Sequence, residues 1–230
     1  MIKFDGITIS LDTKELVNLS FEVDGTLAMV GESGSGKSLT LKAILGILPK
    51  ELTADIKTAG ELSLQRGVDI SLVPQNPFTA LSPMSKIKKQ AWGVKKEVLE
   101  GLFKKVGLSN DFFERFPSQL SGGQLQRVVI AISLASSPKL LLMDEPTTAL
   151  DRDTKDEILE LIKTLQKELK FDLVFVTHEL SLASNLCENI LLIKDGRALR
   201  YGKSSDFFES DDEYIQKLIN ADFKNREFRR

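Results

Sequence analysis

Residues 27–38 begin with an apolar run, Leu27-Ala28-Met29-Val30, which is followed at once by Gly31-Glu32-Ser33-Gly34-Ser35-Gly36-Lys37-Ser38. The second part has the spacing G-x-x-x-x-G-K-[ST]. In a strand–loop–helix setting, this spacing turns backbone N–H groups toward phosphate oxygens at the start of the helix. Lys37 would then reach the β- and γ-phosphates of a nucleotide, and the Ser38 hydroxyl would bind Mg²⁺. The alternative is a Gly/Ser-rich loop that matches by accident.

Short β-type runs surround this loop on both sides. The first two alternate between apolar and polar residues and predict an antiparallel layer with one solvated face. The others are apolar on both faces, as in the buried strands of a parallel sheet. A helical pattern with one apolar face covers 153–170. We therefore predict an α/β fold with a mixed sheet and a small antiparallel layer, its strands lying at 7–11, 19–23, 27–30, 70–73, 140–143, 173–176 and 190–193.

Residues 79–120 differ from the rest of the chain in composition. The stretch 84–110 is rich in Lys and Glu, and it carries Val94, Val98, Leu102 and Val106 at four-residue steps. This spacing predicts helices rather than a further strand. We expect one domain over 1–230, with a core at 1–78 and 136–230 and a helical subdomain inserted at about 79–135.

Composition narrows the class of protein. The chain is 42% hydrophobic and 28% charged, with a formal net charge of -2, which excludes disordered, collagen-like and coiled-coil chains and argues against a strongly basic nucleic-acid-binding domain. The one cysteine, Cys187, cannot form an internal disulfide and reads as a packed small hydrophobe. The apolar run at 128–135 is far shorter than the ~20 residues that cross a bilayer. The basic tail at 223–230 is expected to be solvated, with a contact to acidic lipid headgroups as the alternative.

Two adjacent acids end the predicted strand at 140–143. They are Asp144 and Glu145. Since side chains alternate across a strand, the two carboxylates can serve different partners. Asp144 would complete the Mg²⁺ shell, and Glu145 would position or deprotonate the water that attacks the γ-phosphate. The alternative is a solvated acidic turn, which the phosphate loop upstream disfavours.

A second Gly-rich segment precedes another predicted helix. It reads Leu120-Ser121-Gly122-Gly123-Gln124, and open N–H groups at a helix start make it a candidate anion site. At this segment the sequence resembles the ATP-binding cassette family, whose signature is LSGGQ, and the resemblance covers nearly the whole chain. It implies a P-loop NTPase core that binds ATP and Mg²⁺. It also implies a head-to-tail dimer, in which the signature of one subunit, Ser121 to Gln124, closes over ATP held by loop 31–38 of the other.

The resemblance gives roles to four further residues. Gln75 matches the glutamine that approaches Mg²⁺ and the attacking water, and His178 matches the switch histidine at the γ-phosphate. Asp151 lies in a segment that resembles the D-loop at the subunit interface. Family members place an aromatic ring on adenine after the first strand. Here Leu11 stands at that position, so we expect weak discrimination between ATP and GTP.

The segments 74–83, 146–151 and 208–218 resemble those of peptide and nickel importer ATPases. This implies ATP-driven uptake of a peptide, nickel or another small solute. The implied partners are two integral-membrane permease subunits, a second ATPase subunit and, indirectly, an extracytoplasmic solute-binding protein. The implied location is peripheral, on the cytoplasmic side of a bacterial inner membrane. Two alternatives compete with this interpretation: a cassette ATPase acting on nucleic acid or in translation, and a nucleotide sensor without turnover.

Overall fold

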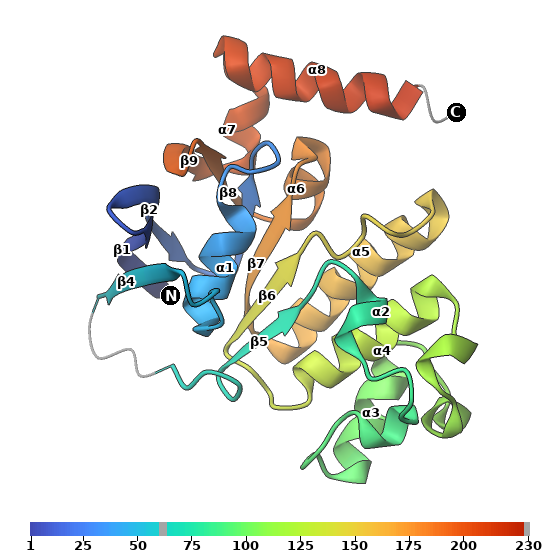
Figure 1. Ribbon diagram of the computed structural model, residues 1–230. Coiled ribbons are helices and arrows are strands. Elements are labelled where there is room, and N and C mark those ends of the chain that lie inside the picture. Colours follow the sequence, from blue (N-terminus) through green and yellow to red (C-terminus); the bar gives the residue numbers. More distant parts are fainter. Residues whose placement is uncertain (60–63, 228–230) are drawn as a thin grey trace. The chain divides into compact units, whose positions relative to one another are not determined.

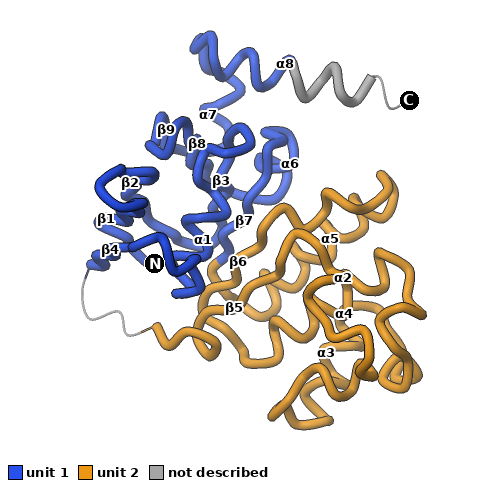
Figure 2. The backbone as a smooth tube through the Cα atoms, viewed as in Figure 1, with its two compact units in different colours: residues 1–63, 173–230 blue, residues 64–172 orange. Residues whose placement is uncertain are grey.

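The computed structural model describes residues 1–59 and 64–227, with the backbone alone described from 221 onwards (Figure 1). Backbone contacts divide the chain into two compact units (Figure 2). Unit 1 comprises residues 1–63 and 173–230, and unit 2 comprises residues 64–172. Unit 2 joins the residues of the predicted helical subdomain at about 79–135 to two strands and a long helix, so the narrower division stays a prediction. The basic tail at 223–230 lies, apart from helix backbone, outside the described residues.

Unit 1 is a mixed sheet with helices. Its strand order is β4-β1-β2-β9-β8-β3-β7. β1 pairs antiparallel with β2 and β4, whereas β3 pairs parallel with both β7 and β8. The predicted mixed sheet with an antiparallel layer is therefore confirmed. The elements are β1 (Ile2–Leu11), β2 (Lys14–Val23), β3 (Thr26–Val30), α1 (Lys37–Leu45), β4 (Leu52–Thr58), β7 (Asp172–Thr177), α6 (Leu180–Leu186), β8 (Asn189–Lys194), β9 (Arg197–Lys203), α7 (Ser204–Phe208) and α8 (Glu213–Glu227).

Burial in unit 1 follows the sequence pattern. All five residues of β3 are buried, as expected of a strand covered on both faces. In β1 the buried residues alternate, and Phe4 stacks on Phe21 of β2 with ring centroids 4.9 Å apart. Cys187 is buried at the end of α6, and this burial raises the pKa of its thiol, as befits a packed residue. β3 thus runs through the core of unit 1 and ends at the predicted phosphate loop.

Unit 2 is mainly helical. It contains β5 (Ile70–Val73), α2 (Pro77–Ala80), η1 (Ile87–Lys89), α3 (Lys96–Lys105), η2 (Asn110–Glu114), η3 (Pro117–Gln119), α4 (Gly122–Leu134), β6 (Leu140–Asp144) and α5 (Arg152–Leu169). β5 and β6 pair in parallel. The helical character of 79–135 is confirmed. Of the residues at four-residue steps, Leu102 and Val106 are buried and Val98 is exposed, and α3 also buries Leu99 and Phe103, which packs on Phe113.

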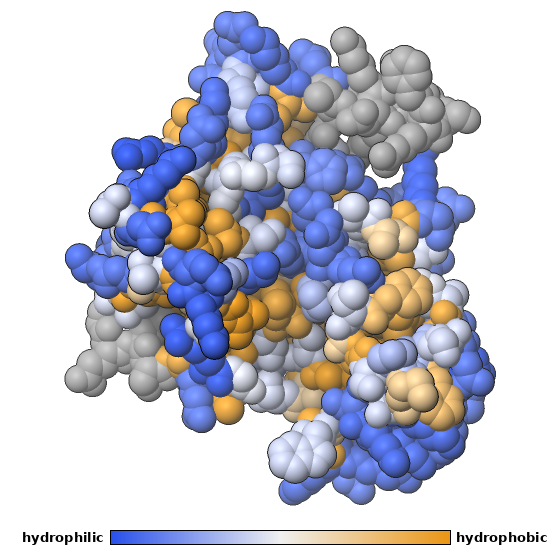
Figure 3. Space-filling view, in the orientation of Figure 1, coloured by the Kyte–Doolittle hydropathy of each residue, from blue (hydrophilic) through white to orange (hydrophobic). Residues whose placement is uncertain are grey.

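Unit 2 also exposes large apolar side chains. Phe78 is 52% exposed, Met84 86% and Trp92 96%. Figure 3 shows the apolar surface of the drawn face as separate patches, one of them over the helices of unit 2. Of the helices in the described ranges, none combines the length and apolar character of a membrane span.

Candidate functional site

The phosphate loop connects β3 to α1, as the sequence predicts. Gly36 precedes the helix with φ 101, a left-handed conformation that favours glycine, and a Cβ there would lie 2.6 Å from Cγ2 of Val17. A Cβ on Gly31 would overlap the carbonyl oxygen of Ile193. Both glycines are therefore required by the backbone's path, which leaves the loop as a cradle of main-chain groups at the start of α1.

The ammonium of Lys37 lies inside this cradle. The side chain is buried, and Nζ donates to the carbonyl oxygens of Gly31 (2.7 Å) and Glu32 (2.8 Å) and to Oγ of Ser35 (3.4 Å). The loop thus fixes a positive charge beside its N–H groups, which is what phosphate oxygens require. Ser38 is the second residue of α1. The exposed members of the loop are Glu32, Ser33 and Gly34.

His178 reaches the same edge of unit 1. In the parallel pair of β3 and β7, Val30 stands opposite Thr177, so the residues that follow, Gly31 and His178, emerge side by side. The imidazole is about half exposed, with Nε2 4.0 Å from Oε1 of Glu179. The register therefore brings the predicted switch histidine next to the phosphate loop. Leu11 ends β1 opposite Lys14 and is partly exposed, and its place under adenine stays a prediction.

The acidic residues occupy the corresponding edge in unit 2. Val73 of β5 stands opposite Met143 of β6, so Gln75, Asp144 and Glu145 follow the carboxyl ends of two neighbouring parallel strands. Gln75 is exposed, and Asp144 and Glu145 are partly buried. Carboxylate, amide and hydroxyl oxygens are the ligands that Mg²⁺ prefers. The oxygen atoms of Asp144 and Gln75 in unit 2, and separately that of Ser38 in unit 1, are therefore each of a kind that Mg²⁺ binds, and the cradle of unit 1 fits nucleotide phosphates.

Glu145 is held in an unusual backbone conformation. Its φ is 45, which is uncommon for a non-glycine residue and costs of order 1–3 kcal/mol. The hydroxyl of Thr148 donates to Oε2 of Glu145 (3.0 Å). Thr148 is a residue that the sequence analysis missed, although its position three residues after the glutamate, at the next turn of the chain, is a usable signal. The carboxylate is thus oriented by both backbone and side chain.

The signature segment caps α4. Oγ of Ser121 accepts from the Gln124 N–H (3.3 Å), and Oε1 of Gln124 accepts from the Ser121 N–H (3.1 Å), which is a capping box. A Cβ on Gly123 would lie 2.5 Å from Cγ2 of Thr154 in α5, whereas one on Gly122 would meet only Leu150 at 3.6 Å. Of the N–H groups at the start of α4, the capping box uses those of Ser121 and Gln124, and helix geometry leaves those of Gly122 and Gly123 open to an anion. The second glycine is also needed because α5 approaches so closely.

Asp151 caps α5. Its two carboxylate oxygens accept from the backbone N–H (3.0 Å) and the hydroxyl (2.8 Å) of Thr154. The pKa of Asp151 is lowered most by the hydrogen bond from the Thr154 backbone N–H and next by that from the Thr154 hydroxyl. The structure thus assigns Asp151 a capping role that the sequence analysis did not predict. Its predicted place at a subunit interface is a separate matter and stays a prediction.

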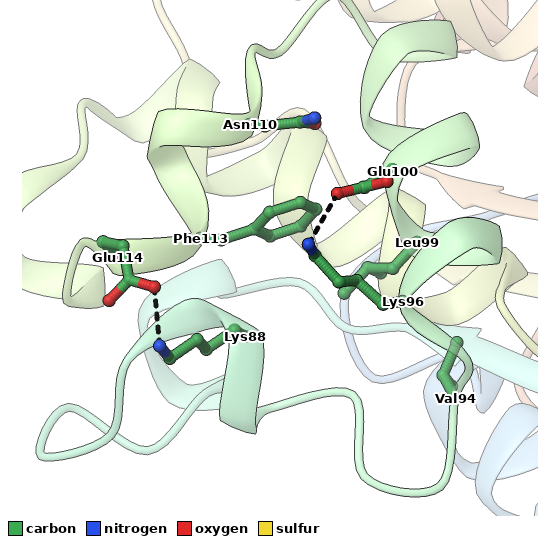
Figure 4. Close-up of a pocket in the computed structure, with 8 residues that line it drawn as sticks. All are labelled: Lys88, Val94, Lys96, Leu99, Glu100, Asn110, Phe113 and Glu114. Carbon is green, nitrogen blue, oxygen red and sulfur yellow. Dashed lines mark hydrogen bonds and ion pairs between the residues drawn. The ribbon is translucent and has the colours of Figure 1, made fainter.

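A cavity of about 440 Å³ opens in unit 2 away from these motifs. Figure 4 shows the ring of Phe113 between two ion pairs, Lys88 with Glu114 at 2.6 Å and Lys96 with Glu100 at 3.3 Å. The cavity therefore has an apolar wall at Phe113. The charged side chains at its rim are paired with one another.

Comparison with known protein families shows to which family the chain belongs. The family described as ABC transporter matches residues 15–148, which include the phosphate loop, the signature and both acids. The chain belongs to this family. It is 36% identical over 233 residues to the uncharacterized ABC transporter ATP-binding protein YejF of Escherichia coli K12, covering 90% of this chain and 44% of that protein.

Two further proteins agree with this assignment. The oligopeptide transport ATP-binding protein OppD of Bacillus subtilis is 37% identical over 219 residues, covering 84% of this chain and 61% of OppD. The chain thus spans about half the length of these curated relatives. The structure of cbiO1 from Clostridium perfringens, part of the ABC transporter complex cbiONQ, superposes with a TM-score of 0.77 at 26% identity and covers 94% of this chain and 93% of cbiO1. The predicted cassette fold is therefore confirmed.

Proposed function

We propose that this ABC family member binds and hydrolyses Mg-ATP as the ATPase subunit of an importer, and that it couples hydrolysis to solute uptake through separate permeases. The observation that carries the proposal is the phosphate cradle with the Lys37 ammonium enclosed by it. A buried ammonium beside the open N–H groups of the loop is suited to an anion with several oxygens.

The chemistry follows from the side chains. Lys37 binds the β- and γ-phosphate oxygens and offsets their charge. Ser38, Asp144 and Gln75 would hold Mg²⁺, which when bound would neutralise the charge that develops on the phosphates. Glu145 accepts the proton of the attacking water, and the Thr148 hydroxyl keeps its carboxylate oriented. His178 donates to a γ-phosphate oxygen.

The signature acts on a second nucleotide in this proposal. The open N–H groups at the start of α4, with Ser121, Gly122, Gly123 and Gln124, receive the γ-phosphate of ATP bound by a partner ATPase subunit. Asp151 lies at the contact between the two subunits. ATP closes the pair, and hydrolysis at Glu145 opens it. The partner is a second copy of this chain or a related ATPase.

Two integral-membrane permease subunits receive this motion, with an extracytoplasmic solute-binding protein acting upstream of them. The exposed apolar side chains of Phe78, Met84 and Trp92 support a docking role for unit 2, because large exposed apolar groups mark interaction sites. We infer a peripheral position on the cytoplasmic side of a bacterial inner membrane. The name of OppD supports a peptide as the solute, with nickel and other small solutes as the remaining candidates.

A cassette ATPase acting on nucleic acid or in translation is the alternative function. The formal net charge of -2 disfavours it, since binding to a phosphate backbone depends on clustered Lys and Arg. The relatives YejF and OppD are also named as transporter ATP-binding proteins, which favours transport. Recovery with integral-membrane permeases, as against recovery with nucleic acid, separates the two functions in a pull-down from membranes and lysate.

The test of ATP hydrolysis is Glu145→Gln. The amide keeps the shape of the side chain but cannot accept the proton, so we expect phosphate release to fall by a factor of about 10²–10⁴. ATP binding should persist, and the ATP-bound dimer should accumulate. Lys37→Ala should instead weaken nucleotide binding itself. The matched control is Glu160→Gln on the exposed face of α5, which should hydrolyse ATP at the wild-type rate.

Phosphate release by Glu145→Gln at the rate of Glu160→Gln would contradict the role of Glu145. A wild-type chain that binds ATP but releases no phosphate, alone or with permeases, would instead identify a nucleotide sensor.

A further inference from the structure

Tyr214 at the start of α8 is fixed in place by its own helix. Oδ1 of Asp212 accepts from the N–H groups of Tyr214 (2.9 Å) and Ile215 (3.1 Å), which caps the helix. Ile215 and Ile219 are buried, and α8 packs against α6 and α7. The first turn of α8 therefore cannot shift without uncovering apolar surface.

The side chain of Tyr214 reaches the phosphate loop. Its hydroxyl donates to Oε1 of Glu32 (3.3 Å), although the two residues are 182 positions apart in the chain. Nζ of Lys194, at the end of β8, lies 4.6 Å from the centroid of the Tyr214 ring, within the range of a cation–π contact. The ring is thus held between a cation and the loop.

Glu32 links this contact to the lysine of the loop. Its side chain points outward to Tyr214, while its main-chain carbonyl accepts from Nζ of Lys37 (2.8 Å) and from the Ser35 N–H (3.2 Å). Because a peptide unit is planar and rigid, a shift of the Glu32 side chain and backbone moves this carbonyl. Glu32 is therefore the residue through which a distant group can act on Lys37.

The neighbouring part of the loop is supported independently. The Gly196 N–H, in the turn between β8 and β9, donates to the Ser35 carbonyl (3.2 Å), and Gly31 lies against the carbonyl of Ile193. Among the residues that the structure describes, Tyr214 is the one side chain seen to hold the carboxylate of Glu32. Support of this turn of the loop thus depends on α8.

We propose that Tyr214 is a positioning residue for the phosphate loop, whose hydroxyl holds Glu32 so that the Glu32 carbonyl stays on the Lys37 ammonium. The inference rests on the proposed function in one respect, namely that the loop binds nucleotide phosphates. It adds to that function a link between the C-terminal helix and nucleotide affinity.

The link works in both directions. Coupling between two sites is reciprocal. If the Tyr214 hydroxyl raises the affinity of the loop for ATP, bound ATP in turn stabilises the contact of Tyr214 with Glu32. Burial, and then the negative charge of Glu32, raise the pKa of Tyr214, so its hydroxyl remains a donor at neutral pH. The link therefore does not switch off in the physiological range.

The test is Tyr214→Phe, which removes the hydroxyl and keeps the ring. We expect the Kd for ATP and for ADP to rise about three- to tenfold. The lost hydrogen bond is one to a charged group, and only part of its free energy contributes to nucleotide binding. The control is Tyr201→Phe, at the chain's other tyrosine, whose hydroxyl bonds the Glu22 carbonyl in the sheet. It should leave both Kd values unchanged while costing a similar shift in Tm.

A double-mutant cycle separates positioning from packing. Glu32→Ala should match Tyr214→Phe, because both changes remove the same hydrogen bond. Tyr214→Phe combined with Glu32→Ala should bind no more weakly than either single variant. Adding ATP should slow amide exchange over 213–220 in the wild type and not in Tyr214→Phe.

Affinity of Tyr214→Phe within twofold of the wild type would overturn the inference and leave the proposed function standing. A wild-type chain that binds no ATP would overturn the proposed function itself, and that result appears before any variant is made. Fully additive losses in the double variant would show that the two residues act separately and would also overturn the inference.

Discussion

Gln126 is a polar side chain in an apolar position. It lies in α4 and is fully buried, and neither its amide nitrogen nor its amide oxygen has a hydrogen-bond partner among the described residues. A buried polar group without a partner costs about 1–3 kcal/mol, since it loses its hydrogen bonds to water on folding. At the scale of a single residue, Gln126 therefore lowers the stability of the fold.

Replacing Gln126 by Met should therefore stabilise unit 2. Methionine is unbranched and of similar length, so it fills the same space without polar atoms. We expect the free energy of unfolding, measured by urea denaturation, to rise by about 1–3 kcal/mol. Gln126→Glu, which buries a charge in the same space, should lower it. A loss of stability in Gln126→Met would mean that the amide is hydrogen-bonded after all.

At the scale of elements, α5 approaches α4 closely at Gly123. A methyl group on Gly123 would meet Cγ2 of Thr154 at 2.5 Å, so Gly123→Ala should push the helices apart and cost about 1–3 kcal/mol. Gly122→Ala is the matched control, because the added methyl would make ordinary contact with Leu150 and alanine favours the helix. Urea denaturation of the two variants measures the difference. Equal stabilities would show that Thr154 turns away at little cost.

The same elements show what the sequence could predict. The strands with continuous apolar runs, such as β3, β6 and β8, were predicted because burial on both faces leaves an unmistakable pattern. β4 and β9 were not predicted, since most of their side chains are exposed and polar and only pairing with a neighbour makes them strands. Four-residue steps drift around a helix with 3.6 residues per turn, so Val98 falls on the exposed side of α3 although Leu102 and Val106 are buried.

The candidate site divides in a similar way. The phosphate loop, the acids and the signature were predicted because each is a local motif. The capping role of Asp151 could also have been found, since an aspartate directly before a periodic helix is a usual N-cap. The contact of Tyr214 with Glu32 could not have been found from local pattern, because the two residues meet only after the sheet and α8 have formed.

At the scale of the whole molecule, the chain has one tryptophan, and that residue is 96% exposed. The fully buried aromatic side chains, such as Phe103, Phe175 and Phe207, are phenylalanines. The emission of an indole depends on the polarity around its ring. The fluorescence of Trp92 therefore reports on the surface of unit 2 and does not report on the core of either unit.

The tryptophan fluorescence of this protein should therefore change little when the protein unfolds. We expect the native emission maximum to lie close to that of free tryptophan in water and to move little through a urea transition that circular dichroism follows fully. A native maximum well to the blue would mean that something covers Trp92, and a dilution series would identify self-association as the cause. When a permease whose own tryptophans have been replaced is added, a blue shift of the emission has one source, the covering of Trp92 on unit 2.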